Sequence, residues 1–209
     1  MFYKYPRTLH CPWSPGGTKD DKILGSMDEF VGKKVVVTEK MDGENTTIYR
    51  NHTHARSTSS AHHPSRGWVK ALQGRLSYHI PEGWRICGEN LFARHSISYQ
   101  ELDSYFLCYS IWTEENICLD WDTTLEWCEL LEIVPVPVLW SGIYDEKAIK
   151  ASWKPQKGEQ ESEGYVIRLF DSFAYEDFGK CVAKYVRANH VQSDSHWMFE
   201  EVVPNKLKV

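Results

Sequence analysis

The sequence reads KVVVTEKMDG at residues 34–43 and TTIYR at residues 46–50. Both runs are rich in β-branched side chains, which pack well on the pleated surface of a strand. An Asp-Gly pair between two such runs is a typical signal of a tight hairpin turn. We therefore predict two strands joined as a hairpin, with Lys40 at a strand end beside the turn.

The rest of the chain alternates between helix and strand signals. Helices are expected where apolar residues recur at helical spacing after a side chain that can cap the first turn. The three expected helices are residues 65–78, 122–133 and 145–153, and they begin at Ser65, Asp122 and Asp145. Further strands are expected at residues 84–91, 105–112, 117–121, 164–170 and 181–187. The polar stretch at residues 154–162 is expected to be a mobile loop.

Size and composition predict one globular domain. The 209 residues suffice for one substantial core, and 42% hydrophobic and 25% charged residues are usual for globular proteins. Residues 1–30, rich in proline, glycine and polar side chains, are expected to form an irregular arm. We predict that residues 1–209 form a single α+β domain with antiparallel-rich sheets and flanking helices.

Charge, cysteine content and hydropathy exclude several classes of protein. A net charge of −5 argues against holding nucleic acid through a general basic surface, so any such contact must be local. The six cysteines form no C-x-x-C pair, and no leader-like segment is seen, so we expect a reducing, cytoplasmic setting. No apolar run approaches the roughly 20 residues needed to cross a bilayer, so we expect no membrane span.

Five segments stand in an informative order along the chain. They are Lys40-Met41-Asp42-Gly43, Cys87-Gly88-Glu89-Asn90, the aromatic strand at residues 105–111, Glu163-Gly164-Tyr165-Val166, and Ala183-Lys184-Tyr185-Val186-Arg187. Each alone is an ordinary strand end, and the first alone would indicate only a hairpin turn with a solvated lysine. In this order and spacing they resemble motifs I, III, IIIa, IV and V of the covalent nucleotidyltransferases, which include ATP-dependent ligases and mRNA capping enzymes.

Within that superfamily the chain is most similar to the phage-type RNA ligases. The similarity is carried by EKMDGEN at residues 39–45, ARS at 55–57 and SEGYV at 162–166, and it spans about residues 34–190. It implies a nucleotidyltransferase catalytic core, an ATP-grasp-like ligase fold. Larger relatives carry an extra domain after the last motif, and only 22 residues follow Arg187 here. We therefore expect a bare core with no separate OB domain.

The resemblance implies a covalent reaction with ATP. Lys40 would attack the α-phosphate, expel pyrophosphate and become lysyl-AMP; the AMP would then pass to an RNA 5′-phosphate, and a 3′-hydroxyl would displace it to join the ends. A free lysine has a pKa near 10.4, so we expect Lys184, Arg187 and a bound Mg²⁺ to disfavour its ammonium form. Lys184 and Arg56 are the cations expected to stabilise the phosphoryl charge.

The same resemblance assigns the remaining site residues. Glu163 would hold the metal, which is Mg²⁺ or alternatively Mn²⁺, and would also take part in catalysis. Glu89 would bind the ribose hydroxyls, and Glu39 would read the adenine amino group. Asn45 would orient the phosphate side of the nucleotide or serve only as a turn residue.

Two assignments have competing candidates. Tyr109 is expected to stack on adenine, with Phe106 as the alternative, since residues an odd number apart on a strand face opposite sides. The last motif commonly carries two lysines separated by one residue, yet Val182 stands two positions before Lys184. Lys180 or Arg187 is expected to supply the second cation.

Other functions and other sites compete with this hypothesis. A DNA nick ligase or a GTP-dependent capping guanylyltransferase would use the same motifs, and a non-catalytic nucleotide-binding or RNA-binding module would lack the covalent step. The expected partners are ATP, RNA with 5′-phosphate and 3′-hydroxyl ends, and an end-healing kinase or phosphatase. The histidines at positions 52, 54, 62 and 63 indicate a plain exposed loop or a loop near RNA rather than a zinc site. Residues 189–192 with 196–197 are expected to pack against the core.

Overall fold

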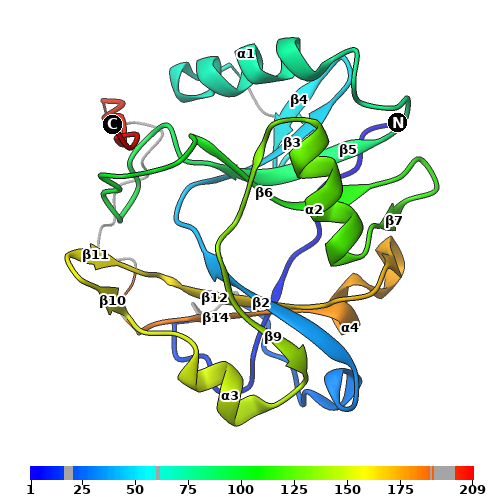
Figure 1. The fold of residues 1–209 in the computed structure, drawn as a ribbon, viewed down its shortest axis with the longest axis vertical. Coiled ribbons are helices and arrows are strands. Elements are labelled where there is room, and N and C mark those ends of the chain that lie inside the picture. The colour runs from blue at the N-terminus through cyan, green and yellow to red at the C-terminus, as the bar shows by residue number, and fades with distance from the viewer. Residues whose placement is uncertain (17–20, 60–61, 189, 191–200) are drawn as a thin grey trace.

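The computed structural model contains two large β-sheets, one above the other in Figure 1, and a separate two-stranded hairpin. The helix at residues 67–76 lies above the upper sheet in that view, and the helix at residues 146–151 lies below the lower one. It describes residues 1–16, 21–59, 62–188, 190 and 201–209. Within these residues one sheet has the strand order β1-β14-β12-β2-β9, and the other has the order β13-β7-β6-β5-β3-β4, with β8 beside β6. Most neighbouring strands are antiparallel, so the predicted α+β class with antiparallel-rich sheets is confirmed.

The elements have the following bounds. The first sheet contains β1 (Leu9–His10), β2 (Lys34–Lys40), β9 (Val138–Ile143), β12 (Gly164–Leu169) and β14 (Val182–Val186). The second contains β3 (Glu44–Tyr49), β4 (Thr53–Ala55), β5 (Arg85–Asn90), β6 (Phe106–Trp112), β7 (Ile117–Cys118), β8 (Val134–Pro135) and β13 (Phe173–Ala174). The α-helices are α1 (Gly67–Leu76), α2 (Trp121–Leu130), α3 (Glu146–Ala151) and α4 (Phe178–Cys181), and the 3-10 helices are η1 (Asp28–Phe30), η2 (Pro64–Arg66) and η3 (Tyr175–Asp177).

Strand β2 lies inside its sheet, between β12 and β9. Its three consecutive valines are all fully buried. Val35 and Val37 belong to one hydrophobic cluster and Val36 to another, because successive side chains of a strand point to opposite faces. The uninterrupted apolar run at residues 35–37 is therefore explained by a strand that is covered on both sides.

The predicted hairpin between residues 34–40 and 46–50 is wrong. β2 pairs with strands of the five-stranded sheet, whereas β3 pairs with β4 and β5 of the seven-stranded sheet. Asp42 and Gly43 therefore carry the chain from one sheet to the other. A Cβ atom on Gly43 would lie 2.6 Å from the carbonyl oxygen of Asn90, so glycine is needed here for close approach of two backbones rather than for a turn.

Helix starts and the polar loop also differ from the prediction in detail. Asp120, not Asp122, caps α2, because its carboxylate accepts the backbone N–H of Thr123 at 2.9 Å. α1 begins at Gly67 after η2, which His63 rather than Ser65 caps. Asp145 caps α3 as predicted. Residues expected to be a mobile loop instead contain a hairpin of β10 (Gln156–Lys157) and β11 (Gln160–Glu161).

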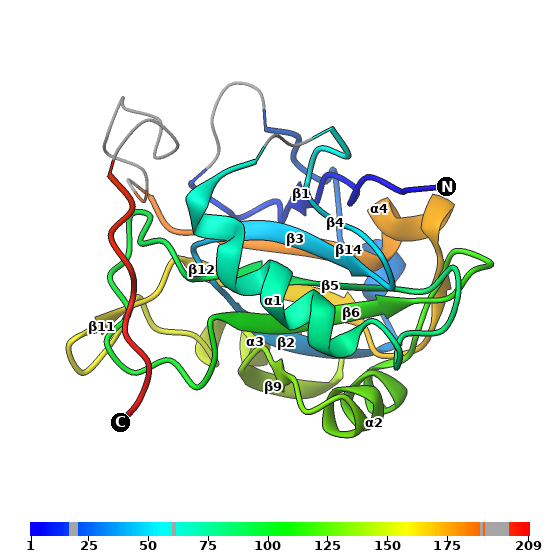
Figure 2. The same cartoon turned by 90° about the horizontal axis from the view of Figure 1, so that it is seen from above.

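The described residues of the N-terminal arm make regular contacts with both sheets. The backbone N–H of Tyr3 donates to the hydroxyl of Tyr49 in the seven-stranded sheet at 2.9 Å. Further along, β1 pairs in parallel with β14 of the five-stranded sheet. The arm, dark blue in Figures 1 and 2, therefore crosses from one sheet to the other and carries β1 and η1.

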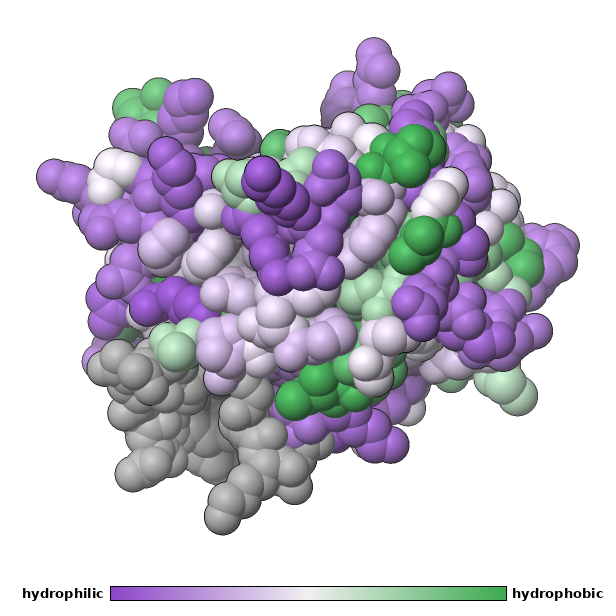
Figure 3. Space-filling model, turned by 90° about the horizontal axis from the view of Figure 1, so that it is seen from below, coloured by the Kyte–Doolittle hydropathy of each residue, from purple (hydrophilic) through white to green (hydrophobic). Residues whose placement is uncertain are grey.

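The opposite terminus lies along the loop between β5 and β6. Residues 201–209, red in Figure 2, form isolated bridges to it at Ala93↔Pro204 and Leu102↔Leu207. On the face seen in Figure 3, apolar side chains stand in separate groups among polar ones. No helix in the described part of the chain has the length and apolar character to cross a membrane.

Candidate active site

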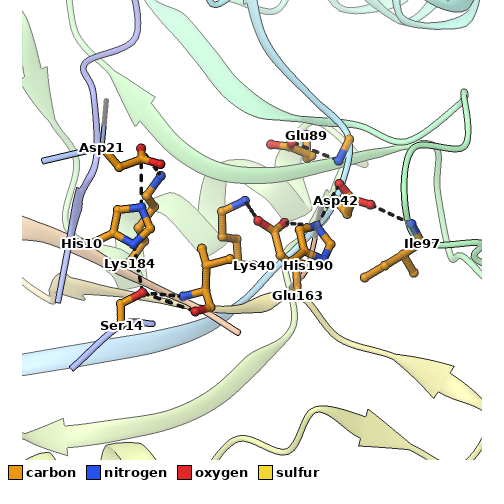
Figure 4. Close-up of polar contacts among 12 residues, drawn as sticks. His10, Ser14, Asp21, Lys40, Asp42, Glu89, Ile97, Glu163, Lys184 and His190 are labelled. Atoms are coloured by element: carbon orange, nitrogen blue, oxygen red, sulfur yellow. Dashed lines mark hydrogen bonds and ion pairs between the residues drawn. The ribbon is translucent and has the colours of Figure 1, made fainter. Parts of the chain in front are cut away.

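A cavity of ≈ 340 Å³ lies where β2 ends, between the two sheets. Seven of the eight residues that the motifs predicted for the site line this cavity: Glu39, Lys40, Asn45, Arg56, Glu89, Tyr109 and Lys184. The eighth, Glu163, places its Oε1 atom 2.7 Å from the Nζ atom of Lys40 (Figure 4). Side chains that are distant in sequence therefore meet around one amine.

Strand pairing places Glu163 beside Lys40. Gly164, the first residue of β12, is the register partner of Lys40 in β2 and of Val186 in β14. A Cβ atom on Gly164 would lie 1.9 Å from the carbonyl oxygen of Tyr185, so the three strands can approach this closely only with glycine at that position. The preceding residue, Glu163, is 6% exposed and lies at the end of the strand next to the amine.

Carboxylates dominate the electrostatics around Lys40. Burial acts to lower the pKa of its ammonium, but the charges of Glu163, Glu89 and Asp42 act in the opposite direction and leave that pKa raised. We predicted that nearby cations would disfavour the ammonium form of Lys40. For the protein side chains without a bound metal ion, this prediction is wrong. At Lys184, by contrast, burial and the charge of Lys40 lower the pKa despite the opposing charge of Asp21.

Glu89 is the most perturbed carboxyl of the cavity. Burial, supported by the negative charges of Glu163 and Asp42, raises its pKa to about 8, although Lys40 and the N–H of Gly43 oppose the shift. The Oε1 atom of Glu89 accepts that N–H at 3.2 Å. This carboxyl is therefore largely protonated at neutral pH in the described arrangement.

Tyr109 and Asn45 form one wall of the cavity. The Asn45 side-chain amide donates to the Tyr109 hydroxyl, and the ring of Tyr5 from the arm meets the Tyr109 ring edge-on at 5.3 Å between centroids. Phe106, three positions earlier on β6, is fully buried in a different hydrophobic cluster and does not line the cavity. Of the two aromatic candidates, only Tyr109 therefore faces the cavity.

The cations of the cavity come from three parts of the chain. Lys184 lies on β14, and its Nζ atom is 3.5 Å from the carboxylate of Asp21, which is also 3.5 Å from His10 Nε2 (Figure 4). Arg56 follows β4 and is exposed at the cavity. Arg7, from the arm, also lines the cavity and was not predicted as a site residue.

Neither candidate for the second cation of the last motif lies at the cavity. Val182 and Lys184 both line it, because they share a face of β14. Lys180 points away and pairs with Asp177 at 3.1 Å, and the guanidinium of Arg187 pairs with Glu161 at 2.7 Å. An apolar side chain, Val182, therefore lies at the position where the resemblance led us to look for a second lysine.

His190 is a site residue that the sequence reasoning assigned to packing. Its Nε2 atom lies 3.5 Å from Asp42 Oδ1 and 3.7 Å from Glu163 Oε2. His190 is 8% exposed, so it is buried as predicted, and its ring also lies beside two carboxylates next to Lys40. Residues 189, 191–192 and 196–197 lie outside the described residues. A single histidine three residues after the last motif carries no local signal that would have identified it.

These three side chains fit a divalent cation. Ligand atoms of Asp42, Glu163 and His190 lie within 4.8 Å of one another. Glu163 Oε2 is buried without a hydrogen-bond partner among the described residues, and two carboxylates with one imidazole are donors that bind divalent ions. The histidines at positions 52, 54, 62 and 63 belong to no such group in the described part of the chain.

Comparisons with known proteins agree on a family and a fold. The model of a family described as RNA ligase matches residues 33–186. Two mutants of Naegleria gruberi RNA ligase, both with ATP and Mn, are similar in structure. One has a TM-score of 0.55 at 16% identity, covering 90% of this chain and 60% of that chain. The other has a TM-score of 0.54 at 18% identity, covering 77% of this chain and 52% of that chain. An archaeal ATP-dependent RNA ligase has a TM-score of 0.51 at 16% identity, covering 78% of this chain and 45% of that chain.

The similarity covers only part of each matched structure. The chain spans about half the length of the solved structures it matches. At 16% to 18% identity, their likeness shows the shared fold. Among curated proteins, none matches the sequence.

Proposed function

The chain belongs to the RNA ligase family, and on this premise we propose that it joins RNA ends through an AMP group carried on Lys40. The observation that supports the proposal most strongly is the position of the Lys40 amine in a ≈ 340 Å³ cavity that five separate motifs line or border. The substrates are ATP and RNA with 5′-phosphate and 3′-hydroxyl ends. RNA repair in a cytoplasmic setting, with an end-healing kinase or phosphatase as partner, stays a prediction.

The first step forms a bond between the Lys40 nitrogen and the α-phosphorus of ATP. The bond from that phosphorus to the bridging oxygen breaks and pyrophosphate leaves. The Lys40 ammonium gives one proton to water before the attack, and the bonded nitrogen gives a second to water as the phosphoramidate forms. Glu163 Oε1, 2.7 Å from the nitrogen, holds the ammonium in the cavity before this step. Lys184 and Arg56 place positive charge at the cavity, where it stabilises the negative charge that develops on the phosphoryl oxygens.

Two further transfers complete the joining reaction. A 5′-phosphate oxygen of RNA attacks the phosphorus of lysyl-AMP, forming a phosphoanhydride and returning the amine of Lys40. The 3′-hydroxyl of the second RNA end then attacks the 5′-phosphorus, forming the phosphodiester and releasing AMP. Both substitutions occur at phosphorus, so one cavity with fixed cations serves all three steps.

The remaining cavity residues bind and orient the nucleotide. Tyr109 offers a ring face on which adenine can stack, and Glu39 accepts a hydrogen bond from the adenine amino group. Glu89 contacts the ribose hydroxyls. Asn45, anchored on the Tyr109 hydroxyl, orients the phosphate side of the nucleotide. Each of these contacts fixes the α-phosphorus relative to the Lys40 nitrogen, which is the main requirement of an in-line attack.

Asp42, Glu163 and His190 are the residues that would hold a divalent ion, Mg²⁺ or Mn²⁺. When bound there, the ion supplies positive charge that neutralises phosphoryl oxygens. The carboxylates that hold it are also those that border the Lys40 amine, so the ion site and the nucleophile share one group, Glu163.

Labelling with nucleotides tests the proposal. The protein is incubated with each of the four ribonucleoside triphosphates, labelled at the α-phosphate, and then with nicked or single-stranded RNA and DNA. We expect a covalent label from ATP that Lys40→Ala abolishes and that Lys33→Ala, an exposed lysine just before β2, retains. Joining of RNA in the second stage completes the expected result.

Other outcomes of this assay point to other functions. A label from GTP alone would identify a capping guanylyltransferase. Joining of nicked DNA but not RNA would identify a DNA ligase. Tight ATP binding without any covalent label would identify a binding module and overturn the proposal.

A further inference from the structure

Asp42 is held by a loop rather than by its own sheet. β2 ends at Lys40, and residues 41–43 cross between the two sheets. In the loop between β5 and β6, Ile97 donates its backbone N–H to Asp42 Oδ2 at 2.7 Å. The hydroxyl of Tyr99 accepts the backbone N–H of Asp42 at 2.9 Å. Both the side chain and the backbone of Asp42 therefore depend on residues 91–105, which we call the support loop.

The support loop is held in turn by the C-terminal segment at residues 201–209, which we call the strap. The support loop contains no helix or named strand in the structure. Four of its backbone groups bond to strap residues other than Asn205. The N–H of Arg94 donates to Val203 at 2.8 Å, and the carbonyl of Tyr99 accepts from Lys206 at 2.9 Å. Leu102 donates to Lys206 at 3.0 Å and accepts from Lys208 at 2.9 Å. The shape of this loop is therefore set from outside, by the strap.

Asn205 is the central contact of the strap and is 3% exposed. Its side-chain Oδ1 accepts the N–H of Tyr99 at 2.9 Å, and its Nδ2 donates to the carbonyl oxygens of Leu91 at 2.8 Å and Ala93 at 3.4 Å. Its backbone N–H donates to Phe92 at 2.9 Å. One amide therefore joins the start of the support loop to Tyr99, the residue that holds Asp42.

We propose that Asn205 is a positioning residue of the active site, acting on Asp42 through Tyr99. Removing its amide leaves the buried N–H of Tyr99 and the carbonyl of Leu91 without their partners, and such groups recover hydrogen bonds only if the backbone moves. Movement of Tyr99 displaces Asp42, two residues from Lys40 and 3.5 Å from His190. Asn205 thereby helps to align the nucleophile and the acidic cluster.

The inference rests on the proposed function for its activity readout, so the test adds a readout that needs no activity. Asn205→Ala is compared with Leu207→Ala, a matched change on the same strap at a residue that is 38% exposed. The two measurements are the single-turnover rate of label transfer from ATP and the hydrogen exchange of the amides at residues 42 and 97. Tyr99→Phe, which keeps the ring but removes the hydroxyl, is measured in the same way.

We expect Asn205→Ala to slow label transfer by at least about tenfold, since displacement of a reacting group by about 1 Å costs up to about a hundredfold. The KM for ATP should change by less than about threefold, because no residue expected to contact adenine or ribose is altered. Amides 42 and 97 should exchange faster. Leu207→Ala should leave the rate and the exchange unchanged, and Tyr99→Phe should slow transfer to a similar degree.

The outcomes separate this inference from the proposed function. Absence of label from the unmodified protein would overturn the proposed function, and the exchange data would still report on the contact between the strap and Asp42. Label transfer by Asn205→Ala at the parent rate, with unchanged exchange, would overturn the positioning role. If Asn205→Ala does not fold, as circular dichroism would reveal, Tyr99→Phe decides: a parent rate there also overturns it.

Discussion

Glu89 makes the stability of this protein depend on pH in a direction that can be calculated. Its pKa is raised from an ordinary 4.5 to about 8, with burial as the main cause. Below about pH 4.5 the carboxyl is protonated in both the folded and the unfolded chain, so folding carries no cost of ionisation. Between about pH 4.5 and 8 the unfolded chain releases the proton while the folded chain keeps it, and the free energy of unfolding falls as pH rises.

The magnitude follows from the size of the shift. Each pKa unit corresponds to about 1.4 kcal/mol, so a shift of about 3.5 units removes up to about 5 kcal/mol of stability by about pH 9. Glu89→Gln keeps the shape and hydrogen-bonding capacity of the neutral carboxyl but cannot ionise. The variant and the parent should therefore be about equally stable near pH 5, and the variant should be more stable by several kcal/mol near pH 9.

Urea unfolding, followed by tryptophan fluorescence at about pH 5, 7 and 9 in the presence of a chelator, measures this difference. The nine tryptophans supply the signal, and Glu82→Gln, an exposed carboxyl before β5, is the matched control that should show no pH-dependent difference. Groups that do not interact with Glu89 titrate alike in the variant and the parent, so their contributions cancel. A difference between Glu89→Gln and the parent that stays constant from pH 5 to 9 would refute the reasoning.

Three further changes test the packing that builds the site. Glu44 and Arg66 form a buried ion pair, in which Arg66 Nε donates to the two carboxylate oxygens of Glu44 at 2.8 and 3.0 Å. Arg66→Ala should lower the free energy of unfolding, measured by urea titration, by about 3–5 kcal/mol. A loss below about 1 kcal/mol would contradict a buried pair. Gly164→Ala places a methyl group 1.9 Å from the carbonyl of Tyr185, so thermal scans should show a large drop in melting temperature; an unchanged value would show that β12 and β14 are not packed as described. Gly74→Ala, inside α1 with open space around its Cβ position, should instead raise stability by about 0.5–1 kcal/mol, and a loss there would argue against the helix.

The sequence predicted the side chains of the site better than the path of the backbone between them. Lys40, Glu89, Glu163 and Lys184 each lie at or beside a strand, and the resemblance of their ordered motifs to the nucleotidyltransferases was the basis for proposing that they meet. The Asp42-Gly43 pair failed as a hairpin signal because the same dipeptide serves a tight turn and a close crossover between sheets. Only the pairing of distant strands distinguishes these two uses.

Other features of the molecule depend on long-range contacts that leave no mark in a short stretch of sequence. β9 was not predicted; it lies at the edge of the five-stranded sheet and pairs with β2, about 100 residues earlier in the chain. His190 and Asn205 lie outside the motifs, and their contacts with Asp42 and Tyr99 arise only in the folded chain. The raised pKa of the Lys40 ammonium likewise depends on three carboxylates that the fold brings together.

The central claim is that the nitrogen of Lys40 becomes bonded to AMP. The most direct measurement is tandem mass spectrometry of peptides from protein incubated with ATP and a divalent metal ion, after quenching under conditions that preserve phosphoramidate bonds. We expect AMP on the peptide that contains Lys40, with fragment ions that locate it on that residue. AMP on Lys184 or another residue, with Lys40 unmodified, would contradict it.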